Sequence, residues 1–490
     1  MKLIKQLDIV SLLLWCILLF NLIENISSYY PCLDSIEGPV IYPNDTQFPP
    51  LIIDQNIRVN YTPSVLVYAI NNNDVKKAVI CAIKSGTDIV PRSGGHSYEK
   101  YGLGGRNNTI VLDVSFINVV TVDSERGTVR IGAGNRLGDV YNKLSQAGFL
   151  IPAGSCPSVG VGGHALGGGF GYFSRKYGLA CDNIVSMEMV DSKGNLLNIS
   201  NSNRHRKLFF ALRGAGGGSY GIVTYFEFSI HRKPQKVTYM SFEFDRTVKA
   251  QVQQLFYAFN KVGPSLSNDI GLKLRLRKDL LSITGVYLGP PRQAKKAMRR
   301  FLCDAPKPIN PIGTQYIQKT FIESVETLSN SSKYDVFSPK HNPNFFKVKS
   351  FYINKGKALN ETAINVLVDY LDKAKCTTLA SFDLYGGVIN DVYYDKTSFI
   401  HRNALYCLQL EANWKYKERD DQCVKEINDF GKEFQSNFTS PFSYQGFIDR
   451  ELDNWQVRYY GNIFGKLIDI KKEYDSCNLF RFPQSIPVMI

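Results

Sequence analysis

Residues 154–184 read GSCPSVGVGGHALGGGFGYFSRKYGLACDNI, and the glycine-rich centre of this stretch, 160–171, decides the fold. Two further glycine clusters flank it, RSGGHS at 92–97 and RGAGGG at 213–218. Consecutive glycines allow backbone N–H groups to close on an anionic group, because no Cβ atom stands in the way. Tight turns in a β-rich fold would also use glycine. Three clusters within ~130 residues nevertheless favour a large cofactor that carries phosphate groups.

Two familiar signatures in these clusters lack their structural context. Residues 160–165 (GVGGHA) fit G-x-G-x-x-A, but a dinucleotide-binding fingerprint follows an apolar strand, and GSCP at 154–157 precedes it here. Residues 217–221 (GGSYG) fit G-x-S-x-G, but a nucleophile elbow leads into a helix, whereas a strand is predicted at 222–230. The sequence therefore argues against a Rossmann site and against a serine hydrolase.

His96 and Cys156 are the reactive side chains of the glycine-rich loops. His96 follows Gly94-Gly95, and Cys156 lies between Gly154 and Pro157. A side chain in such a loop reaches a ligand more easily than one in a core. A structural histidine and an inert thiol remain the alternative interpretation of each residue taken alone.

The pattern of elements divides the chain. Residues 60–230 hold short β-type runs, with amphipathic helices at 74–85 and 137–147 and a hairpin at 184–199. Residues 235–440 hold longer helical patterns between isolated strands, at 248–262, 291–302, 363–374 and 421–433. A last helix is expected at 454–474. These patterns predict an α+β fold with more than one domain.

Composition excludes several classes of protein. With 490 residues, of which 44% are hydrophobic and 21% charged, the chain can bury a large core and is not disordered. The net charge of +14 is scattered, as in 275–278 and 295–300, rather than gathered into a tail. We interpret these residues as solvated faces and expect no nucleic-acid partner.

The N-terminus has the pattern of a secretory signal peptide. Basic residues in 1–5 precede an apolar run at 9–20 and the small pair Ser27-Ser28, which predicts a signal peptide over residues 1–28. The alternative is a membrane anchor, but the run is short of the ~20 residues that a spanning helix needs. Glycosylation sequons, which fit a secreted, extracellular protein, begin at Asn44, Asn60, Asn107, Asn198, Asn330, Asn360 and Asn437.

Cysteine usage leaves an odd thiol. Removal of the signal peptide takes Cys16 from the 10 cysteines, so at least one of the others is unpaired or has another use. There is no C-x-x-C or H-E-x-x-H spacing, so we expect no metal site.

Taken together, the motifs resemble the flavoproteins of the berberine bridge enzyme and oligosaccharide oxidase family, whose FAD domain is of the vanillyl-alcohol oxidase (PCMH) type. The motifs that carry the resemblance are 91–105 (PRSGGHSYEKYGLGG), 154–184, 208–230, 382–390 (FDLYGGVIN), 399–405 (FIHRNAL) and 459–487. The resemblance implies an FAD-binding domain at 60–234 and a substrate domain at 235–444 with an antiparallel sheet. It also implies that 445–490 return to the FAD domain.

The resemblance implies FAD held by two covalent bonds, from His96 to the flavin 8α-methyl group and from Cys156 to C6. That use of Cys156 would account for the odd cysteine, and a disulfide is implied between Cys32 and Cys81. Val159 matches the position that controls oxygen access, and valine there resembles the oxidases. The remaining residues implied to bind the cofactor are Arg92, Ser93, Gly94, Gly95, Ser97, Gly160, Gly162, Gly163 and His164.

The expected catalytic pair is incomplete. In the saccharide oxidases that this chain resembles, the base is the second tyrosine of Tyr-x-Asn-Tyr, supported by an aspartate that Asp383 matches. Here residues 444–447 read YQGF, so Phe447 stands at the base position and cannot accept a proton. We expect Tyr444 to replace it, with Tyr385 and Asp383 as further candidates and ordinary packing as the alternative for Tyr444. Tyr98 resembles a sugar-stacking residue and Gln409 a polar substrate contact, with a structural role as the alternative for both.

The sequence thus predicts a secreted FAD-dependent oxidase. The expected reaction converts the anomeric alcohol of a mono- or oligosaccharide to a lactone, and O2 is reduced to H2O2. Because Phe447 breaks the saccharide-type pair, the alternatives are an oxidase of a non-sugar alcohol or secondary metabolite and a weakly active glycan-binding flavoprotein. No stable membrane insertion is expected after signal removal.

Overall fold

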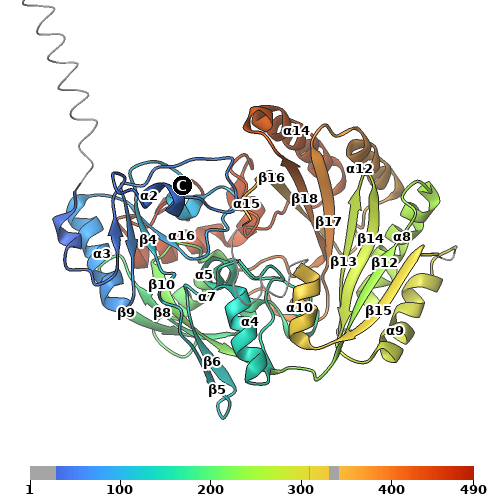
Figure 1. The fold of residues 1–490 in the computed structure, drawn as a ribbon, viewed down its shortest axis with the longest axis horizontal. Helices are drawn as coiled ribbons and strands as arrows, with labels where there is room; N and C mark the ends of the chain where they lie inside the picture. Colours follow the sequence, from blue (N-terminus) through green and yellow to red (C-terminus); the bar gives the residue numbers. More distant parts are fainter. Residues whose placement is uncertain (1–28, 308, 330–341, 490) are drawn as a thin grey trace, which may run out of the picture.

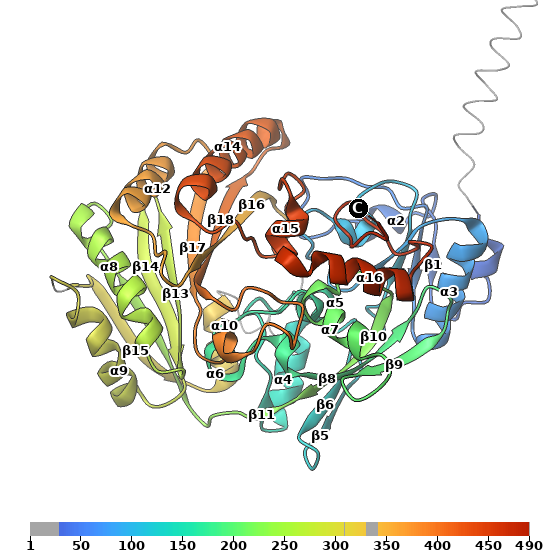
Figure 2. The same cartoon turned by 180° about the vertical axis from the view of Figure 1, so that it is seen from behind.

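The computed structural model describes residues 29–307, 309–329 and 342–489 (Figure 1). The predicted signal peptide at 1–28 and the sequon at Asn330 lie outside these residues. The described chain folds into two halves, each built on its own sheets (Figures 1 and 2). Residues of both halves line one cavity. No helix in the part of the chain that the structure describes is long and apolar enough to span a bilayer.

The first half contains two sheets of different type. The smaller has the order β1-β2-β4-β3, in which β2, β4 and β3 are parallel, and its strands are β1 (Val40–Ile41), β2 (Val65–Tyr68), β4 (Ile110–Asp113) and β3 (Ile89–Arg92). The larger is antiparallel, with the order β5 (Val120–Asp123), β6 (Thr128–Gly132), β10 (Ile222–Ser229), β8 (Ile184–Val190), β9 (Leu196–Ser200). The predicted hairpin at 184–199 is the β8–β9 pair. A short pair, β7 (Phe149–Leu150) and β11 (His231–Arg232), completes the strands.

Helices of this half cover both sheets. The helix α3 is capped at its start by the Asn71 side chain and ends at Gly86, whose left-handed backbone suits glycine. It begins two residues earlier than predicted. The helices here are α2 (Phe48–Leu51), α3 (Asn72–Ser85), α4 (Leu137–Gln146), α5 (Val161–Leu166), α6 (Ser174–Tyr177) and α7 (Arg206–Ala215).

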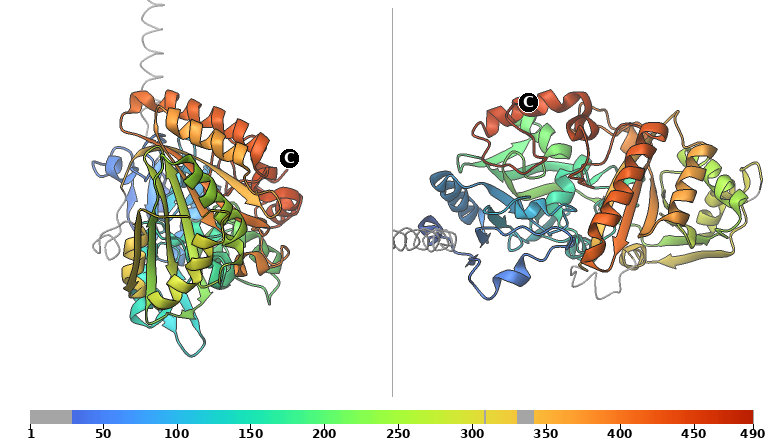
Figure 3. Two further views of the ribbon diagram at one scale, coloured as in Figure 1. Left: turned by 90° about the vertical axis from the view of Figure 1, so that its right-hand side faces the viewer. Right: turned by 90° about the horizontal axis from the view of Figure 1, so that it is seen from above.

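The second half is a seven-stranded antiparallel sheet. Its order is β15-β12-β14-β13-β17-β18-β16, and Figure 3 shows helices lying along one face of it. Those helices pack their apolar sides on the strands in a separate core. The strands are β12 (Val237–Glu243), β13 (Ile270–Arg277), β14 (Leu280–Tyr287), β15 (Gly313–Lys319), β16 (Phe345–Asn354), β17 (Thr377–Leu384) and β18 (Ala404–Trp414). The helices on that face are α8 (Lys249–Lys261), α9 (Pro291–Cys303), α12 (Glu361–Lys373) and α14 (Asp420–Phe438). The helices α10 (Phe321–Ser329) and α13 (Val388–Asp391) instead add their buried residues to the core of the first half.

The antiparallel sheet and the mixed α+β composition confirm the predicted fold class. The exact domain boundaries stay a prediction. The first half also uses chain that the prediction left out, because β1 at Val40–Ile41 adds a strand to the smaller sheet.

The tail crosses back to the first half, where its last helix packs on α7 (Figure 2). The prediction of one helix over 454–474 is wrong. The structure has α15 (Trp455–Tyr460), a short 3-10 turn, and α16 (Phe464–Tyr474). The break falls at Gly461, whose φ of 55° is not helical and favours glycine. The amphipathic pattern continued through this glycine and concealed the break.

Two disulfides are present in the described chain. Cys32–Cys81 confirms the pairing that the resemblance implied, and it ties the N-terminal segment to α3. Cys376–Cys423, which was not predicted, ties the start of β17 to α14. The cysteines that remain free in the structure are Cys156, Cys181, Cys303, Cys407 and Cys477.

Candidate cofactor and substrate site

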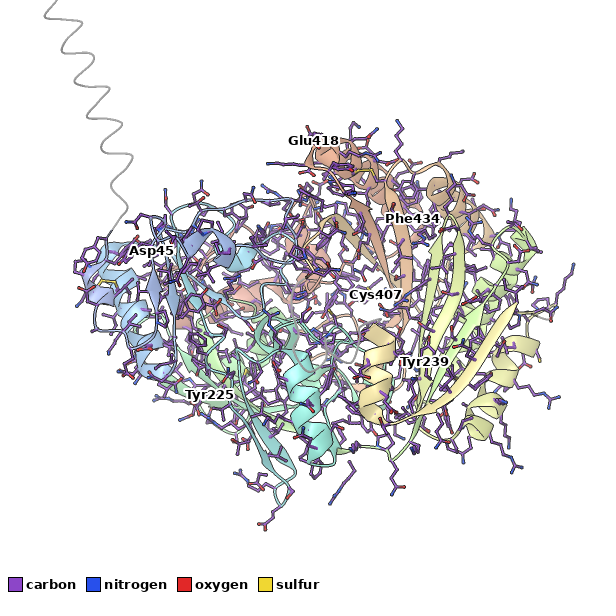
Figure 4. The ribbon with its side chains drawn as sticks, in the orientation of Figure 1. Asp45, Tyr225, Tyr239, Cys407, Glu418 and Phe434 are labelled. Atoms are coloured by element: carbon purple, nitrogen blue, oxygen red, sulfur yellow. A yellow bond between two sulfur atoms is a disulfide. The ribbon has the colours of Figure 1, made fainter. Side chains whose placement is uncertain are left out.

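A cavity of about 600 Å³ lies between the two halves and brings all three glycine clusters to one wall. This volume is within the range of small-molecule and cofactor sites, roughly 300–1,000 Å³. The opposite wall comes from the large sheet and the tail, with Phe346 on β16, Glu411 and Asn413 on β18, and residues 444–448. In Figure 4 the labels on Cys407 and Phe434 mark residues of β18 and α14, both in the half that contains the seven-stranded sheet.

The first two glycine clusters touch each other. A Cβ atom on Gly94 would lie 2.2 Å from the backbone nitrogen of Gly160, and one on Gly160 would lie 2.2 Å from that of Gly94. Conversely, a Cβ on Gly163 or Gly217 would meet no protein atom within 4 Å, although both residues line the cavity. The clusters therefore close on each other at one point and leave bare backbone facing open space at another, which is the form of a phosphate cradle.

Replacing Gly160 with alanine is expected to reduce the flavin content of the purified protein. The new Cβ would force the two loops apart, and overpacking of this kind costs about 1–3 kcal/mol. The ratio of flavin to protein absorbance measures the effect. Gly465→Ala is the matched control, since its Cβ meets nothing within 4 Å in α16. Wild-type flavin content in Gly160→Ala would show that the contact between the loops is unimportant.

The polar side chains of the 92–97 loop hold the loop itself. Arg92 is buried and pairs with Asp54 at 2.7 Å and Asp113 at 3.4 Å. Ser93 Oγ donates to the carbonyl of Ala133, and Ser97 Oγ accepts from the N–H of Tyr101. These three residues were predicted as cofactor contacts. In the structure their side chains bind other protein groups, so their backbone groups are what a ligand in the cavity can contact.

His96 and Cys156, 60 positions apart in the numbering, converge on one hydroxyl group. His96 Nε2 lies 2.9 Å from Ser158 Oγ, and Cys156 Sγ lies 3.4 Å from the same oxygen. Arg136 fixes this turn by donating to the carbonyl of Ser158 at 2.7 Å. Cys156 is exposed to the cavity, which Val159 also lines. The imidazole and the thiol therefore lie side by side at one end of the glycine-lined wall.

His164 has a supporting position. It lines the cavity, but its Nε2 accepts a hydrogen bond from the N–H of Gly154 at 2.8 Å. Burial lowers the pKa of His164 to about 4, so the ring is neutral and can accept that bond. His164 was predicted as a cofactor contact, and the structure shows its side chain holding the loop that carries Cys156.

The substrate end of the cavity combines an aromatic cluster with a row of polar groups. The Tyr98 ring stacks on Phe447 at 5.5 Å and meets Phe346 edge-on at 5.2 Å. Gln409 Nε2 donates to Tyr98 Oη at 3.3 Å, so the structure brings together the two residues predicted to contact substrate. Gln409 also donates to Glu411 at 3.2 Å, and Asn413 donates to the other oxygen of Glu411 at 2.8 Å.

Sequence reasoning missed Glu411 and Asn413. The signal was present in β18, where Gln409, Glu411 and Asn413 alternate with buried apolar residues. In a strand such alternation places the three polar side chains on one face. Without the structure, nothing indicated that this face lines a cavity rather than meeting solvent.

The three predicted proton acceptors lie in different surroundings. Asp383 pairs with Lys273 at 3.0 Å, and Tyr385 stacks on Phe170 at 4.8 Å, and neither is among the described residues that line the cavity. Tyr444 does line the cavity, and its Oη accepts from the N–H of Gly169 at 3.1 Å. Burial raises the pKa of Tyr444 above its usual range, which favours the neutral phenol.

A buried ionic cluster lies behind the aromatic rings. Lys347 on β16 is fully buried and contacts Glu99 at 2.6 Å, Asp449 at 2.6 Å, and Glu451. Lys349 contacts the second oxygen of Asp449 at 2.7 Å. The three carboxylates lie close enough to hold a metal ion, but the Lys347 ammonium already contacts all of them. The cluster joins the residue after Tyr98 to the segment just after Phe447.

Comparison with known proteins identifies the cofactor domain. The family described as FAD binding domain matches residues 63–200, and the family described as berberine and berberine like matches residues 443–487. The uncharacterized FAD-linked oxidoreductase YvdP of Bacillus subtilis is 29% identical over 459 residues, covering 92% of this chain and 98% of that protein.

Solved structures give the same result over nearly the full length. BBE-like 1 of Physcomitrella patens is 34% identical, with a TM-score of 0.88, over 94% of this chain and 99% of that one. The xylooligosaccharide oxidase of Myceliophthora thermophila, solved in complex with xylobiose, is 27% identical with a TM-score of 0.85, over 94% and 99% of the chains.

The residues present fit FAD. The bare backbone at Gly163 and Gly217 can receive a pyrophosphate, and one cavity extends from there to His96 and Cys156. These two side chains contact the same hydroxyl group, that of Ser158, and the 8α-methyl group and C6 of a flavin belong to the same benzenoid ring. This chain belongs to the berberine bridge enzyme-like family and is an FAD-dependent oxidoreductase.

Proposed function

We propose that this protein oxidises the anomeric alcohol of a mono- or oligosaccharide to a lactone and transfers the two electrons to O2, giving H2O2. The observation that carries the proposal is the pairing of the stacked Tyr98 ring with the polar row of Gln409, Glu411 and Asn413. Sugars present apolar ring faces and many hydroxyl groups, so a site for them combines aromatic surfaces with amide and carboxylate groups.

FAD, when bound, accepts the hydride that leaves the substrate carbon. His96 and Cys156 are proposed to hold it by covalent bonds to the 8α-methyl group and to C6. The shared contact with Ser158 supports the proposal, because it holds the imidazole and the thiol beside one another. Val159, three residues after Cys156 and on the same wall, is proposed to leave room for O2 beside the ring.

Of the three predicted proton acceptors, Tyr444 alone lines the cavity in the described chain. Asp383 already neutralises Lys273. Tyr385 Oη lies 3.2 Å from Tyr352 Oη, away from the cavity wall. These two residues fit a role in supporting the sheet beneath the substrate.

A panel of alcohols tests the reaction. Anaerobic mixing of the purified protein with glucose, cellobiose or chitobiose is expected to bleach the flavin, and readmission of O2 is expected to restore its colour with one H2O2 per turnover. Stopped-flow absorbance and a peroxide assay measure both half-reactions. Bleaching by benzyl alcohol and not by any sugar would overturn the saccharide assignment.

A second candidate is an oxidase of a non-sugar alcohol or secondary metabolite. Phe447 favours it, because the ring stacked on Tyr98 adds apolar surface where a saccharide oxidase has its base. A third candidate, a glycan-binding flavoprotein with little turnover, predicts that sugar binds while the flavin absorbance stays unchanged.

Secretion is proposed on two observations. The asparagines of six sequons are exposed, namely Asn44, Asn60, Asn107, Asn198, Asn360 and Asn437. The two disulfides fit an oxidising compartment. A secreted sample that loses mass on treatment with an N-glycosidase would support glycosylation at these sites.

A further inference from the structure

We propose that Glu411 is the catalytic carboxylate of this oxidase, receiving the proton of the substrate hydroxyl in place of the tyrosine that Phe447 displaces. This inference rests on the proposed oxidation of an alcohol. It replaces the predicted role of Tyr444 with that of a residue that no sequence motif indicated.

The position of Glu411 carries the inference. Among the described residues that line the cavity, Glu411 is the one carboxylate. It belongs to the same row of β18 as Gln409, which reaches Tyr98 in the loop that follows His96. The carboxylate therefore lies at the substrate end of the cavity that also contains His96 and Cys156.

The hydrogen bonds of Glu411 leave it able to accept a proton. Asn413 donates to one oxygen at 2.8 Å and Gln409 to the other at 3.2 Å. A carboxylate offers about four lone-pair positions, so these two amide donors orient the group and leave lone pairs for a substrate hydroxyl. No salt bridge neutralises Glu411 in the described chain, whereas Asp383 is paired with Lys273.

The surroundings of Glu411 strengthen it as a base. Burial raises its pKa, while Lys273 and Arg275 of β13 lower it in part. Its cross-strand neighbours, Val348 on β16 and Leu379 on β17, carry no charge. From the cofactor side the titratable neighbour is Tyr98, which Gln409 links to Glu411 by hydrogen bonds. A carboxylate with a raised pKa takes a hydroxyl proton more readily than an exposed one.

Tyr444 suits the complementary role. Its Oη accepts from Gly169, and burial favours the protonated phenol, so the hydroxyl can donate to the substrate oxygen. In the proposed step the substrate O–H bond breaks and its proton moves to a Glu411 oxygen. The electron pair of the neighbouring C–H bond leaves as hydride to the bound flavin, and the C–O bond becomes a carbonyl. Two electrons and two protons leave the substrate in all, as the hydride and the hydroxyl proton, and O2 later takes up both electrons and both protons to give H2O2.

Glu411→Gln is the decisive variant, because glutamine keeps the size and one accepting oxygen but cannot take a proton. The rate of flavin bleaching under saturating substrate is expected to fall about 100- to 10,000-fold. The probe is whichever of glucose, cellobiose, chitobiose and benzyl alcohol bleaches the wild-type flavin fastest. Calorimetric binding of 1,5-anhydroglucitol, which lacks the anomeric hydroxyl, is expected to change less than threefold if that probe is a sugar.

The pH profile separates a catalytic from a structural role. In the wild type, kcat/KM is expected to fall on the acid side as Glu411 becomes protonated, and Glu411→Gln is expected to lose this limb. Glu411→Asp should retain the limb with a lower rate. Glu243→Gln, at an exposed carboxylate on β12 of the same sheet, is the matched control and should match the wild type.

Three outcomes would overturn the inference: an unchanged bleaching rate in Glu411→Gln, an acid limb that persists in this variant, or a loss of rate explained by a parallel loss of 1,5-anhydroglucitol binding. Loss of bleaching in Tyr444→Phe with normal bleaching in Glu411→Gln would return the role to Tyr444. Failure of every alcohol to bleach the wild-type flavin is a different result, because it rejects the proposed function itself.

Discussion

Replacement of both His96 and Cys156 with alanine is expected to convert a flavin that stays with the polypeptide after acid denaturation into one that is released completely. In the wild type, acid precipitation should leave the yellow colour in the pellet. Digestion should yield a peptide pair, containing His96 and Cys156, whose mass is increased by one FAD. Each single variant should keep one bond, since the two side chains attack different atoms of the ring.

The structure gives the physical reason for this all-or-none contrast. The His96 ring and the Cys156 thiol both contact Ser158 Oγ, so a flavin placed against one side chain is within reach of the other. Cys303→Ala is the control, because Cys303 is another exposed free thiol and lies outside the cavity wall. Release of intact FAD from denatured wild-type protein would reject both covalent bonds and leave the noncovalent glycine-lined cradle in place.

Local sequence signals were sufficient where a residue acts through its own loop. The three glycine clusters predicted a phosphate-bearing cofactor because bare backbone is a property of the glycines themselves. His96 and Cys156 could be singled out from the sequence because each lies within a glycine-containing loop. The predicted FAD-dependent oxidoreductase and α+β fold are confirmed, and the covalent bonds and the substrate stay predictions.

Residues that act through distant partners could not be predicted in this way. Arg92 was predicted to contact the cofactor, but Asp54 and Asp113 engage its side chain. Glu411 lines the cavity because β18 lies opposite the cofactor half, and no pattern in the sequence indicates that arrangement. The ionic cluster is an extreme case, since Lys347 is 248 residues from Glu99 and 102 from Asp449. No local pattern indicates which of 58 basic residues will meet which of 44 acidic ones.

The second large effect is expected at Lys347, whose replacement with methionine should strongly destabilise the protein. Lys347 has 0% side-chain exposure and contacts Glu99, Asp449 and Glu451. Removal of one partner from a buried ionic group leaves uncompensated charge, which typically costs about 3–5 kcal/mol. Methionine keeps most of the volume, so the loss would come from charge rather than from a cavity. Thermal unfolding followed by circular dichroism measures it.

The control for Lys347 is Lys425→Met, which removes an ion pair with Asp429 on the surface of α14, where the side chains are 77% and 65% exposed. That change should cost no more than about 1 kcal/mol, because water screens the pair. If Lys347→Met does not fold, Lys347→Arg keeps the test decisive, since it restores the charge and should recover most of the stability.

The cluster links Glu99, beside Tyr98, to Asp449, near Phe447. Partial loss of these ionic contacts should therefore also loosen the stacked rings and raise KM before it lowers the flavin content. Equal melting temperatures for Lys347→Met and Lys425→Met would show that the buried charges are solvated by other means and that the cluster does not join the two halves.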